Sequence, residues 1–234
     1  MYQRDIIFSA ILIGATTAVY KTRKLTLAGS FTGATVAICL YLGFLVPGVS
    51  ILAVFFVMAT VATSWQKRKK AAAIKDTHQE KRDAYQVVAN GGVAAIMGLF
   101  NLFVPSLTPY FVIMAAAMAS ATADTLSSEL GTVYGKRFYN VITFKPDERG
   151  RDGVISLEGT LIGVAGAAAI AVVFASYGGA AAHAIVIVIA GTAGNLMNSL
   201  LGAALERKGY LSNNMVNFLN TAFAAFIAWL LVII

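Results

Sequence analysis

The sequence is poor in charge and almost free of cysteine and histidine. Only 12% of its 234 residues are charged, 58% are hydrophobic, and it contains one cysteine and two histidines. The mean hydropathy of +0.74 lies outside the range of soluble globular domains and is typical of a polytopic membrane protein. A single cysteine, Cys39, excludes an internal disulfide and a metal site built from several thiolates.

Several apolar stretches are long enough to cross a bilayer, whose hydrocarbon core needs about 20 apolar residues. The first runs on from Met1 with no small-residue cleavage site, so we expect a retained helix rather than a signal peptide. We predict an all-α fold with about eight transmembrane helices in a single transmembrane domain, residues 1–234. The expected spans are roughly 4–20, 25–45, 49–65, 86–104, 108–128, 157–176, 180–204 and 213–233.

The basic residues predict how these spans are oriented. Every Lys and Arg except Arg4 falls in one of four alternate connections, near residues 21–24, 66–85, 129–156 and 205–212. Lys and Arg in short loops mark the cytoplasmic side of a membrane protein. We therefore predict that these four connections are cytoplasmic and that both termini are external. The expected location is a prokaryotic-type cell membrane.

The chain divides into three parts. Residues 1–65 contain no ionisable residue deep in the membrane and are expected to be scaffold helices. Residues 66–85 form a basic cytoplasmic loop, which either attracts anionic lipid headgroups, at about 1 kcal/mol per charge, or serves as a topology signal. Residues 86–234 are expected to carry the functional site, with a cytoplasmic loop over 129–156.

Polar residues in the later spans gather at one depth. Asp124 lies about one turn inside the predicted interface, and an intramembrane carboxylate marks function by default because it is costly. Amides and hydroxyls recur at the same depth on other spans, which favours one polar cavity open to the cytoplasm over separate contacts between helices. These residues are Gln86, Asn90, Asp124, Ser128, Ser156, Thr160, Asn195, Asn198, Asn214 and Asn217.

The loop over residues 131–155 pairs basic residues with glycines. Glycine lets backbone N–H groups approach an anion closely, and Lys or Arg supplies the countercharge. Ser156, Gly159 and Thr160 lie at the predicted N-terminus of the next helix, where phosphate binds well, although they also suit a helix cap and a packing seam. The loop residues that we expect to contact phosphate are Lys136, Arg137, Lys145, Gly150, Arg151 and Gly153.

The ordered motifs resemble the membrane family that includes the plant and cyanobacterial phytyl-phosphate kinase of vitamin E synthesis. The resemblance implies transfer of the γ-phosphoryl group of a nucleoside triphosphate, CTP or ATP, to a polyprenyl monophosphate, with Mg²⁺ as cofactor. It covers most of the chain and is weakest in the first three spans. The motifs that carry it are Gln86 to Gly91, Ala123 to Gly131, Thr143 to Lys145, Gly150 to Thr160, Asn198 to Ala203, and Asn213 to Asn217.

The resemblance assigns roles to particular residues. It implies that Asp124, Glu129 and the residue at position 198 hold the metal ion, and that Lys145 joins them in catalysis. Position 198 departs from the pattern, because Asn198 stands where the family has Asp, which lowers the affinity for a divalent cation. The residues expected to hold or orient phosphates are Asn90, Ser128, Lys136, Arg137, Gly150, Arg151, Gly153, Ser156, Gly159, Thr160, Asn214 and Asn217.

Two other functions use the same site parts. A cytidylyltransferase would make a CDP-lipid from CTP and a phospholipid. A transporter of anionic lipids or small anions would need polar residues that continue toward the outer face, and the outer halves of the spans offer no matching polar exit. The expected partners are a nucleoside triphosphate, a polyprenyl monophosphate and the membrane, without nucleic acid, and assembly into a homo-oligomer stays open.

Overall fold

The computed structural model describes residues 2–67, 69–70, 81–105 and 110–233, and most of them are helical. A two-stranded antiparallel ribbon, β1 (Tyr139–Asn140) with β2 (Val154–Ile155), closes the loop between α5 and α6. The helices are α1 (Tyr2–Lys21), α2 (Leu27–Ser64), α4 (Ala84–Phe103), α5 (Tyr110–Tyr134), α6 (Leu157–Ser176), α7 (Ala181–Ala204), the short 3-10 helix η1 (Glu206–Lys208) and α8 (Asn213–Ile233).

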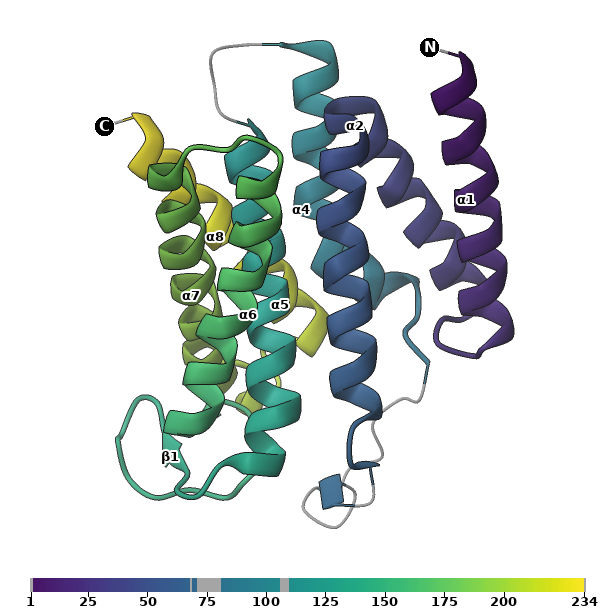
Figure 1. The fold of residues 1–234 in the computed structure, drawn as a ribbon. Helices are drawn as coiled ribbons and strands as arrows, with labels where there is room; N and C mark the ends of the chain where they lie inside the picture. Colours follow the sequence, from purple (N-terminus) through teal and green to yellow (C-terminus); the bar gives the residue numbers. More distant parts are fainter. Residues whose placement is uncertain (1, 68, 71–80, 106–109, 234) are drawn as a thin grey trace.

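Helix α2 consists of two segments that meet at Leu45, where the backbone leaves helical geometry at φ 57° and ψ −144°. Figure 1 shows the segments as two arms of a hairpin, and a Cβ atom on Gly48 would lie 2.9 Å from the carbonyl oxygen of Leu40. The sequence predicts this turn at Pro47 and Gly48. The break comes earlier because proline is tolerated in the first turn of a helix, where its missing N–H group has no partner to lose.

Six helices in the described part of the chain are long and apolar enough to span a membrane. They are α2, α4, α5, α6, α7 with η1, and α8. The expected number of eight counts α1 and the two arms of α2 separately. The structure confirms a helical protein with several candidate spans, and the number of crossings stays a prediction.

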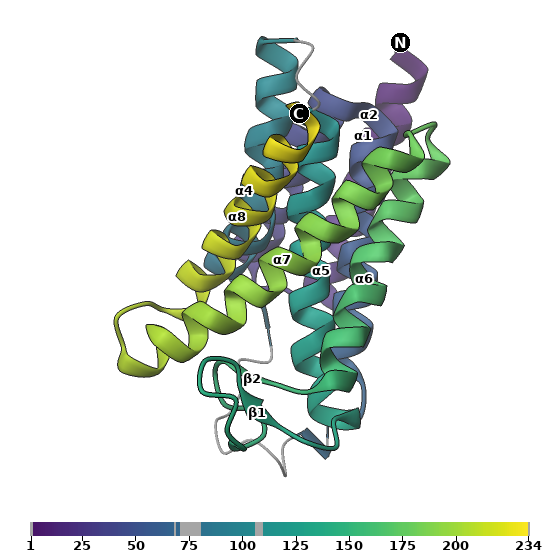
Figure 2. The same ribbon diagram turned by 90° about the vertical axis from the view of Figure 1, so that its left-hand side faces the viewer.

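Helix α5 forms the centre of the bundle and contacts α2, α4, α6, α7 and α8. Figure 2 shows it in the middle, with α6 on one side and α4 and α8 on the other. Its run of small residues allows these neighbours to approach closely, because small side chains bring helix backbones together. Ala115, Ala116 and Ala117 are fully buried, and a Cβ atom on Gly191 of α7 would lie 2.7 Å from the side chain of Ala119.

The four connections rich in Lys and Arg lie at one end of the bundle, which we call the basic end, and both termini lie at the other (Figures 1 and 2). Backbone hydrogen bonds join the first two connections, from Thr26 to Arg82 (3.0 Å) and from Arg82 to Lys24 (3.2 Å). Arg207 joins the last two through the carboxylate of Asp147 (2.8 Å). The predicted topology requires this arrangement, and the side of the membrane that the basic end faces stays a prediction.

Candidate functional site

The inner faces of α4, α5, α7 and α8 change from apolar to polar toward the basic end. Each of these helices carries one polar residue toward the basic end, in the order Asn90, Asp124, Asn198 and Asn217. Each lies three, seven or eight positions along its helix from a residue of a shared apolar cluster. Such spacings keep residues on one helical face. The four helices therefore present polar groups to one interior region below a cluster that comprises Val93, Ile113, Ala116, Ala117, Ala190, Ala225 and Ala228.

Asp124 lies between two hydrogen bonds that tie α5 to its neighbours. One turn nearer the apolar cluster, Ser120 Oγ donates to Asn220 Oδ1 (3.1 Å), and one turn nearer the basic end, Ser127 Oγ donates to Asn195 Oδ1 (3.0 Å). Asp124 is half-buried, and its carboxylate makes no hydrogen bond or ion pair with any described residue. The region thus holds a carboxylate with free capacity for a cation or a polar ligand.

A chain of amides runs from α7 to η1 beside this carboxylate. Asn198 Nδ2 donates to Asn217 Oδ1 (2.8 Å), and Asn217 Nδ2 donates to Asn213 Oδ1 (3.2 Å). The side chain of Asn213 lies next to Glu206, whose carboxylate interacts electrostatically with Asp124. Asn198 and Asn217 are therefore together as predicted. Glu206 was missed, because an acidic residue next to Arg207 and Lys208 in a connection resembles an ordinary solvated charge.

Four buried polar atoms of this region have unused hydrogen-bonding capacity. They are Gln86 Oε1 and Asn90 Oδ1 on α4, Thr192 Oγ1 on α7 and Asn220 Nδ2 on α8, and they lack partners among the described residues. Buried polar atoms in proteins are normally hydrogen-bonded, since leaving one unpaired costs about 1–3 kcal/mol. Both donors and acceptors are present, which suits a polar ligand such as a phosphate ester or a nucleotide.

Mg²⁺ fits this region only with help from a substrate. Within the described ranges, no three His, Cys, Asp or Glu residues lie close enough together to hold a metal ion. Mg²⁺ prefers oxygen ligands and is usually bound through one or two carboxylates together with substrate phosphates and water. Asp124 and the amide oxygen of Asn198 are suitable protein ligands for that arrangement.

The structure does not bring Glu129 to Asp124, contrary to the expectation that they share a metal ion. Glu129 follows Asp124 by five residues, which turns its side chain about 140° around the helix. Its carboxylate pairs with Lys70 Nζ at 2.5 Å, and the same ammonium donates to the carbonyl oxygens of Ala62 (2.9 Å) and Thr63 (2.8 Å). Glu129 therefore already has a protein counter-ion on the α2 side of α5.

The loop over residues 135–155 is held to the end of α7 by Asp147 and Arg207. Asp147 Oδ2 accepts from Arg207 Nη1 (2.8 Å), and Arg207 Nε also donates to the carbonyl oxygen of Asp152. The hydrogen bond from Arg207, helped by the backbone N–H of Glu148, lowers the pKa of Asp147 to about 2. The sequence analysis missed this anchor, which places the loop next to Glu206.

The predicted phosphate-binding cations of this loop differ in their surroundings. Lys136, Arg137 and Lys145 are exposed, and their charged groups make no hydrogen bond or ion pair within the part of the chain that the structure describes. Arg151 instead pairs with Asp147 (3.8 Å) and Glu148 (4.0 Å). Arg137 and Lys145 are therefore available for an anion, Lys136 is available but lies near Glu158, which accepts from its backbone N–H (3.3 Å), and Arg151 is partly neutralised.

Several other predicted phosphate ligands have structural roles. Ser156 caps α6 by accepting from Gly159 N (3.1 Å), and Thr160 Oγ1 donates back to the Ser156 carbonyl (3.0 Å). A Cβ atom on Gly153, whose φ is 69°, would lie 2.4 Å from Ala203. The remaining predicted ligands are Gly150, in a turn at φ 79°, Ser128, which is exposed and bonds the Thr125 carbonyl (3.2 Å), and Asn214, which is half-buried.

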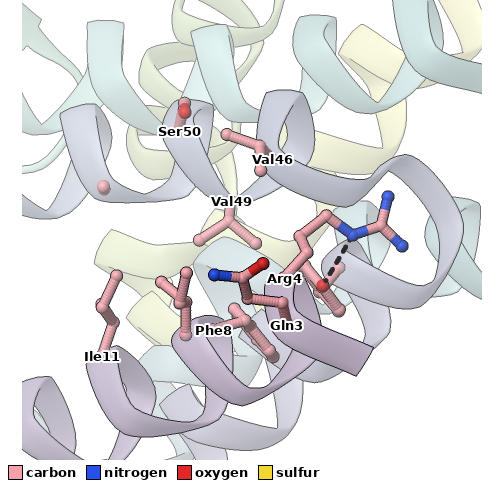
Figure 3. Close-up of a pocket in the computed structure, with 10 residues that line it drawn as sticks. Gln3, Arg4, Phe8, Ile11, Val46, Val49 and Ser50 are labelled. Carbon is pink, nitrogen blue, oxygen red and sulfur yellow. Dashed lines mark hydrogen bonds between the residues drawn. The ribbon is translucent and has the colours of Figure 1, made fainter. Parts of the chain in front are cut away.

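A cavity of about 420 Å³ lies far from this region, between α1 and the turn of α2 (Figure 3). Its lining is largely apolar, with Phe8, Ile11, Val46 and Val49 around it and Arg4 at its edge. Arg4 Nε donates to the hydroxyl of Tyr41 (3.2 Å), so this charge already has a partner. The cavity belongs to the end of the bundle that carries the termini and not to the candidate site.

Comparison with known proteins identifies relatives along most of the chain. Uncharacterized membrane proteins of Synechocystis sp. and Methanocaldococcus jannaschii are each 34% identical to it, over 76% and 71% of this chain and 70% and 68% of their own lengths. Protein VTE6, chloroplastic, of Arabidopsis thaliana is 30% identical over 79% of this chain and 58% of its own length. This match confirms the family resemblance identified from the motifs.

No solved structure matches the chain. A family model described as "Integral membrane protein DUF92" matches residues 10–225, from α1 to α8. The match includes Asp124, the amides of α4, α7 and α8, and the whole loop between α5 and α6. The chain belongs to the DUF92 family of integral membrane proteins.

Proposed function

We propose that this protein is a membrane-embedded kinase that transfers the γ-phosphoryl group of a nucleoside triphosphate, with CTP as the first candidate, to a polyprenyl monophosphate. The observation that carries the proposal is Asp124, a carboxylate that has no counter-ion among the described residues and lies among amides of α4, α7 and α8 at the basic end. The resemblance to the phytyl-phosphate kinase family and the similarity to the Arabidopsis protein support the choice of reaction.

The reaction needs positioning and charge neutralisation more than proton transfer. An oxygen of the prenyl phosphate attacks the γ-phosphorus, the bond from that phosphorus to the β-bridging oxygen breaks, and a nucleoside diphosphate leaves. The acceptor is already ionised near neutral pH, because the second pKa of a phosphate monoester is about 6, so no strong base is required. This fits a site built from a carboxylate and amides.

The residues of the site would have different roles in this reaction. Asp124 and Asn198 Oδ1 would hold Mg²⁺ together with phosphate oxygens, and the bound ion would neutralise charge on the transferring group. The amides of Asn90 and Asn217 would orient the phosphates. The exposed cations of the loop, Lys136, Arg137 and Lys145, would attract the triphosphate and offset its charge.

The membrane arrangement that we propose has eight crossings, external termini and a cytoplasmic basic end. The gathering of the four basic connections at one end supports it. A nucleotide would then enter from the cytoplasm, and the isoprenoid tail of the acceptor would lie between helices in the bilayer.

A transporter is less well supported, because the interior region above Ser120 is filled by side chains of the apolar cluster. That packing leaves no polar continuation toward the other end. A cytidylyltransferase would use the same groups as the kinase, and only the product separates the two.

The test is an assay of purified protein in lipid nanodiscs with Mg²⁺, prenyl monophosphates and CTP or ATP labelled at either the α or the γ position. Label from the γ position in a prenyl diphosphate supports the kinase. Label from the α position in a lipid would instead show a CDP-lipid synthase. Asp124→Asn should abolish the product while Val172→Ala, at an exposed position of α6 outside the site, retains it. If no nucleotide yields product and the protein moves lipid across vesicles, the kinase proposal fails.

A further inference from the structure

A second groove lies on the face of α5 that is turned away from Asp124. It has a volume of about 360 Å³ and runs between the second arm of α2 and α5, lined by Val57, Met58, Val61, Ala62, Trp65, Leu126, Leu130 and Tyr134. Leu126 follows Asp124 by two residues, which places it about 200° around the helix. The groove is therefore separate from the candidate active site.

The groove faces the surroundings of the bundle and is almost wholly apolar. Val57 and Val61 on its wall are 58% and 56% exposed, so the groove opens where the hydrocarbon of the bilayer lies. At its basic end Trp65 Nε1 donates to the hydroxyl of Tyr134 (2.8 Å). Trp and Tyr concentrate at membrane interfaces, where the ring is buried and its polar edge meets headgroups. The pair therefore marks the level at which the groove reaches the interface.

Two free cations follow this aromatic pair. After Trp65 the chain turns sharply at Gln66 (φ 44°), and a short helical turn closes through bonds from the N–H groups of Lys69 and Lys70 to the Gln66 carbonyl (2.9 and 3.2 Å). Lys67 and Lys69 are exposed and make no charged contact with other described residues, whereas Lys70 is buried against Glu129. Lys67 and Lys69 thus place positive charge at the level of the lipid headgroups, next to an apolar groove that can hold a hydrocarbon chain.

We propose that this groove binds one chain of an anionic phospholipid whose headgroup lies against Lys67 and Lys69. An apolar slot alone would accept any lipid, and the two cations are what select a negative headgroup. By the usual strength of basic residues at a membrane surface, each such contact gives a preference of about fivefold over a zwitterionic lipid, so two lysines should give at least that preference. The proposal does not depend on the kinase activity.

The two tryptophans of the chain allow a direct test by fluorescence quenching. In Trp229→Phe the only tryptophan is Trp65, at the groove, and in Trp65→Phe it is Trp229, on α8 near the C-terminus and thus at the opposite end. Each variant is placed in phosphatidylcholine vesicles that also contain one brominated lipid, either phosphatidylglycerol or phosphatidylcholine. The bromine atoms lie near the glycerol end of the lipid chains. We expect the anionic lipid to quench Trp65 with at least about fivefold higher affinity, and Trp229 with no preference.

Two further variants separate the charge from the groove. In the Trp229→Phe background, Lys67→Gln with Lys69→Gln should remove the preference. Val57→Phe should weaken quenching by filling the groove, whereas Val172→Phe, at a similarly exposed valine on α6, should not. Circular dichroism checks that each variant is folded.

Equal quenching of Trp65 by the two lipids would overturn the proposal. So would the same anionic preference at Trp229, which would show a general surface effect. A preference that survives removal of both lysine charges would also contradict it.

Discussion

The ion pair between Lys70 and Glu129 gives the sharpest test of how this bundle is held together. Lys70 is buried, with a side chain that is 9% exposed, and its ammonium group contacts Glu129 and two carbonyl oxygens at the end of α2. Glu129 is 26% exposed. If Glu129 is a structural counter-ion, replacing either partner should destabilise the fold, and replacing both should cost less than the sum.

The expected change in the free energy of unfolding follows from the contacts that remain after each substitution. Removing one partner of a fully buried pair costs about 3–5 kcal/mol. Glu129→Gln should cost about 2 kcal/mol, because Lys70 keeps the carbonyls of Ala62 and Thr63 and the Gln oxygen can still accept. Lys70→Met should cost about as much, since it leaves two carbonyls and a partly solvated carboxylate unpaired. We expect a coupling energy of about 1–2 kcal/mol in the double-mutant cycle.

The assay is reversible unfolding of the four proteins in mixed micelles, followed by circular dichroism as the denaturing detergent is increased. Binding of Mn²⁺ in place of Mg²⁺, measured by electron paramagnetic resonance, is the second readout. A structural Glu129 leaves Mn²⁺ affinity within about twofold of the parent protein. If Glu129→Gln weakens Mn²⁺ binding more than tenfold while stability is unchanged, Glu129 is a metal ligand and our interpretation of the ion pair is refuted.

Three more outcomes follow from the site. Asp124→Asn should lower kcat by at least about 100-fold in the proposed kinase assay with normal unfolding, and a small effect would remove Asp124 from the chemistry. Gly153→Ala should destabilise the protein by about 2 kcal/mol in the same micelle titration, because its Cβ would meet Ala203 at a positive φ. The pKa of Asp147 is lowered to about 2 in the folded protein, so its stabilising effect is present above about pH 4 and is lost toward pH 2. The stability difference between Asp147→Asn and the parent should therefore shrink over that range, and a constant difference would contradict the pairing with Arg207.

The long apolar runs made most of the helices predictable. The expected spans 86–104, 157–176 and 213–233 differ by at most two residues at either end from α4, α6 and α8, because hydrophobic length and flanking polar residues set those limits. The turn within α2 was predicted from Pro47 and Gly48 but falls at Leu45. A local motif shows that a chain turns, while packing of the two arms decides at which residue.

The site was predictable where function requires an unusual residue inside the membrane. Asp124 stood out because a carboxylate in an apolar span is rare, and the amides stood out by their shared depth. The pairing of Glu129 was not predictable, because the preceding basic loop offers several cations and only the fold determines that Lys70 turns inward. Asp147 and Arg207 were missed for the same reason, since charged residues in loops rarely reveal their partners in sequence.

At position 198 the family resemblance and the structure give different information. The resemblance to the kinase family makes Asn198 a departure, whereas the structure places it at the head of a polarised amide chain. Asn217 donates to Asn213 and Asn198 donates to Asn217, so the amides of the chain point the same way, toward the end where Asn213 lies beside Glu206. The Oδ1 atom of Asn198 is then left as the free acceptor of the chain, and a neutral oxygen of this kind can bind Mg²⁺.

Asn198→Asp would change both ends of that chain. The added charge should raise Mn²⁺ affinity beside Asp124 by about tenfold, as a second carboxylate does in Mg²⁺ sites. It also removes the first donor, so Asn217 must reverse its amide against Asn213 or leave its oxygen unpaired, at a cost of about 1 kcal/mol. Asn213→Ala breaks the chain beforehand and should abolish this cost. Unfolding in mixed micelles of both single variants and the double variant measures the coupling. If the two changes are additive, the amide chain does not constrain position 198 and the departure there concerns the metal ion alone.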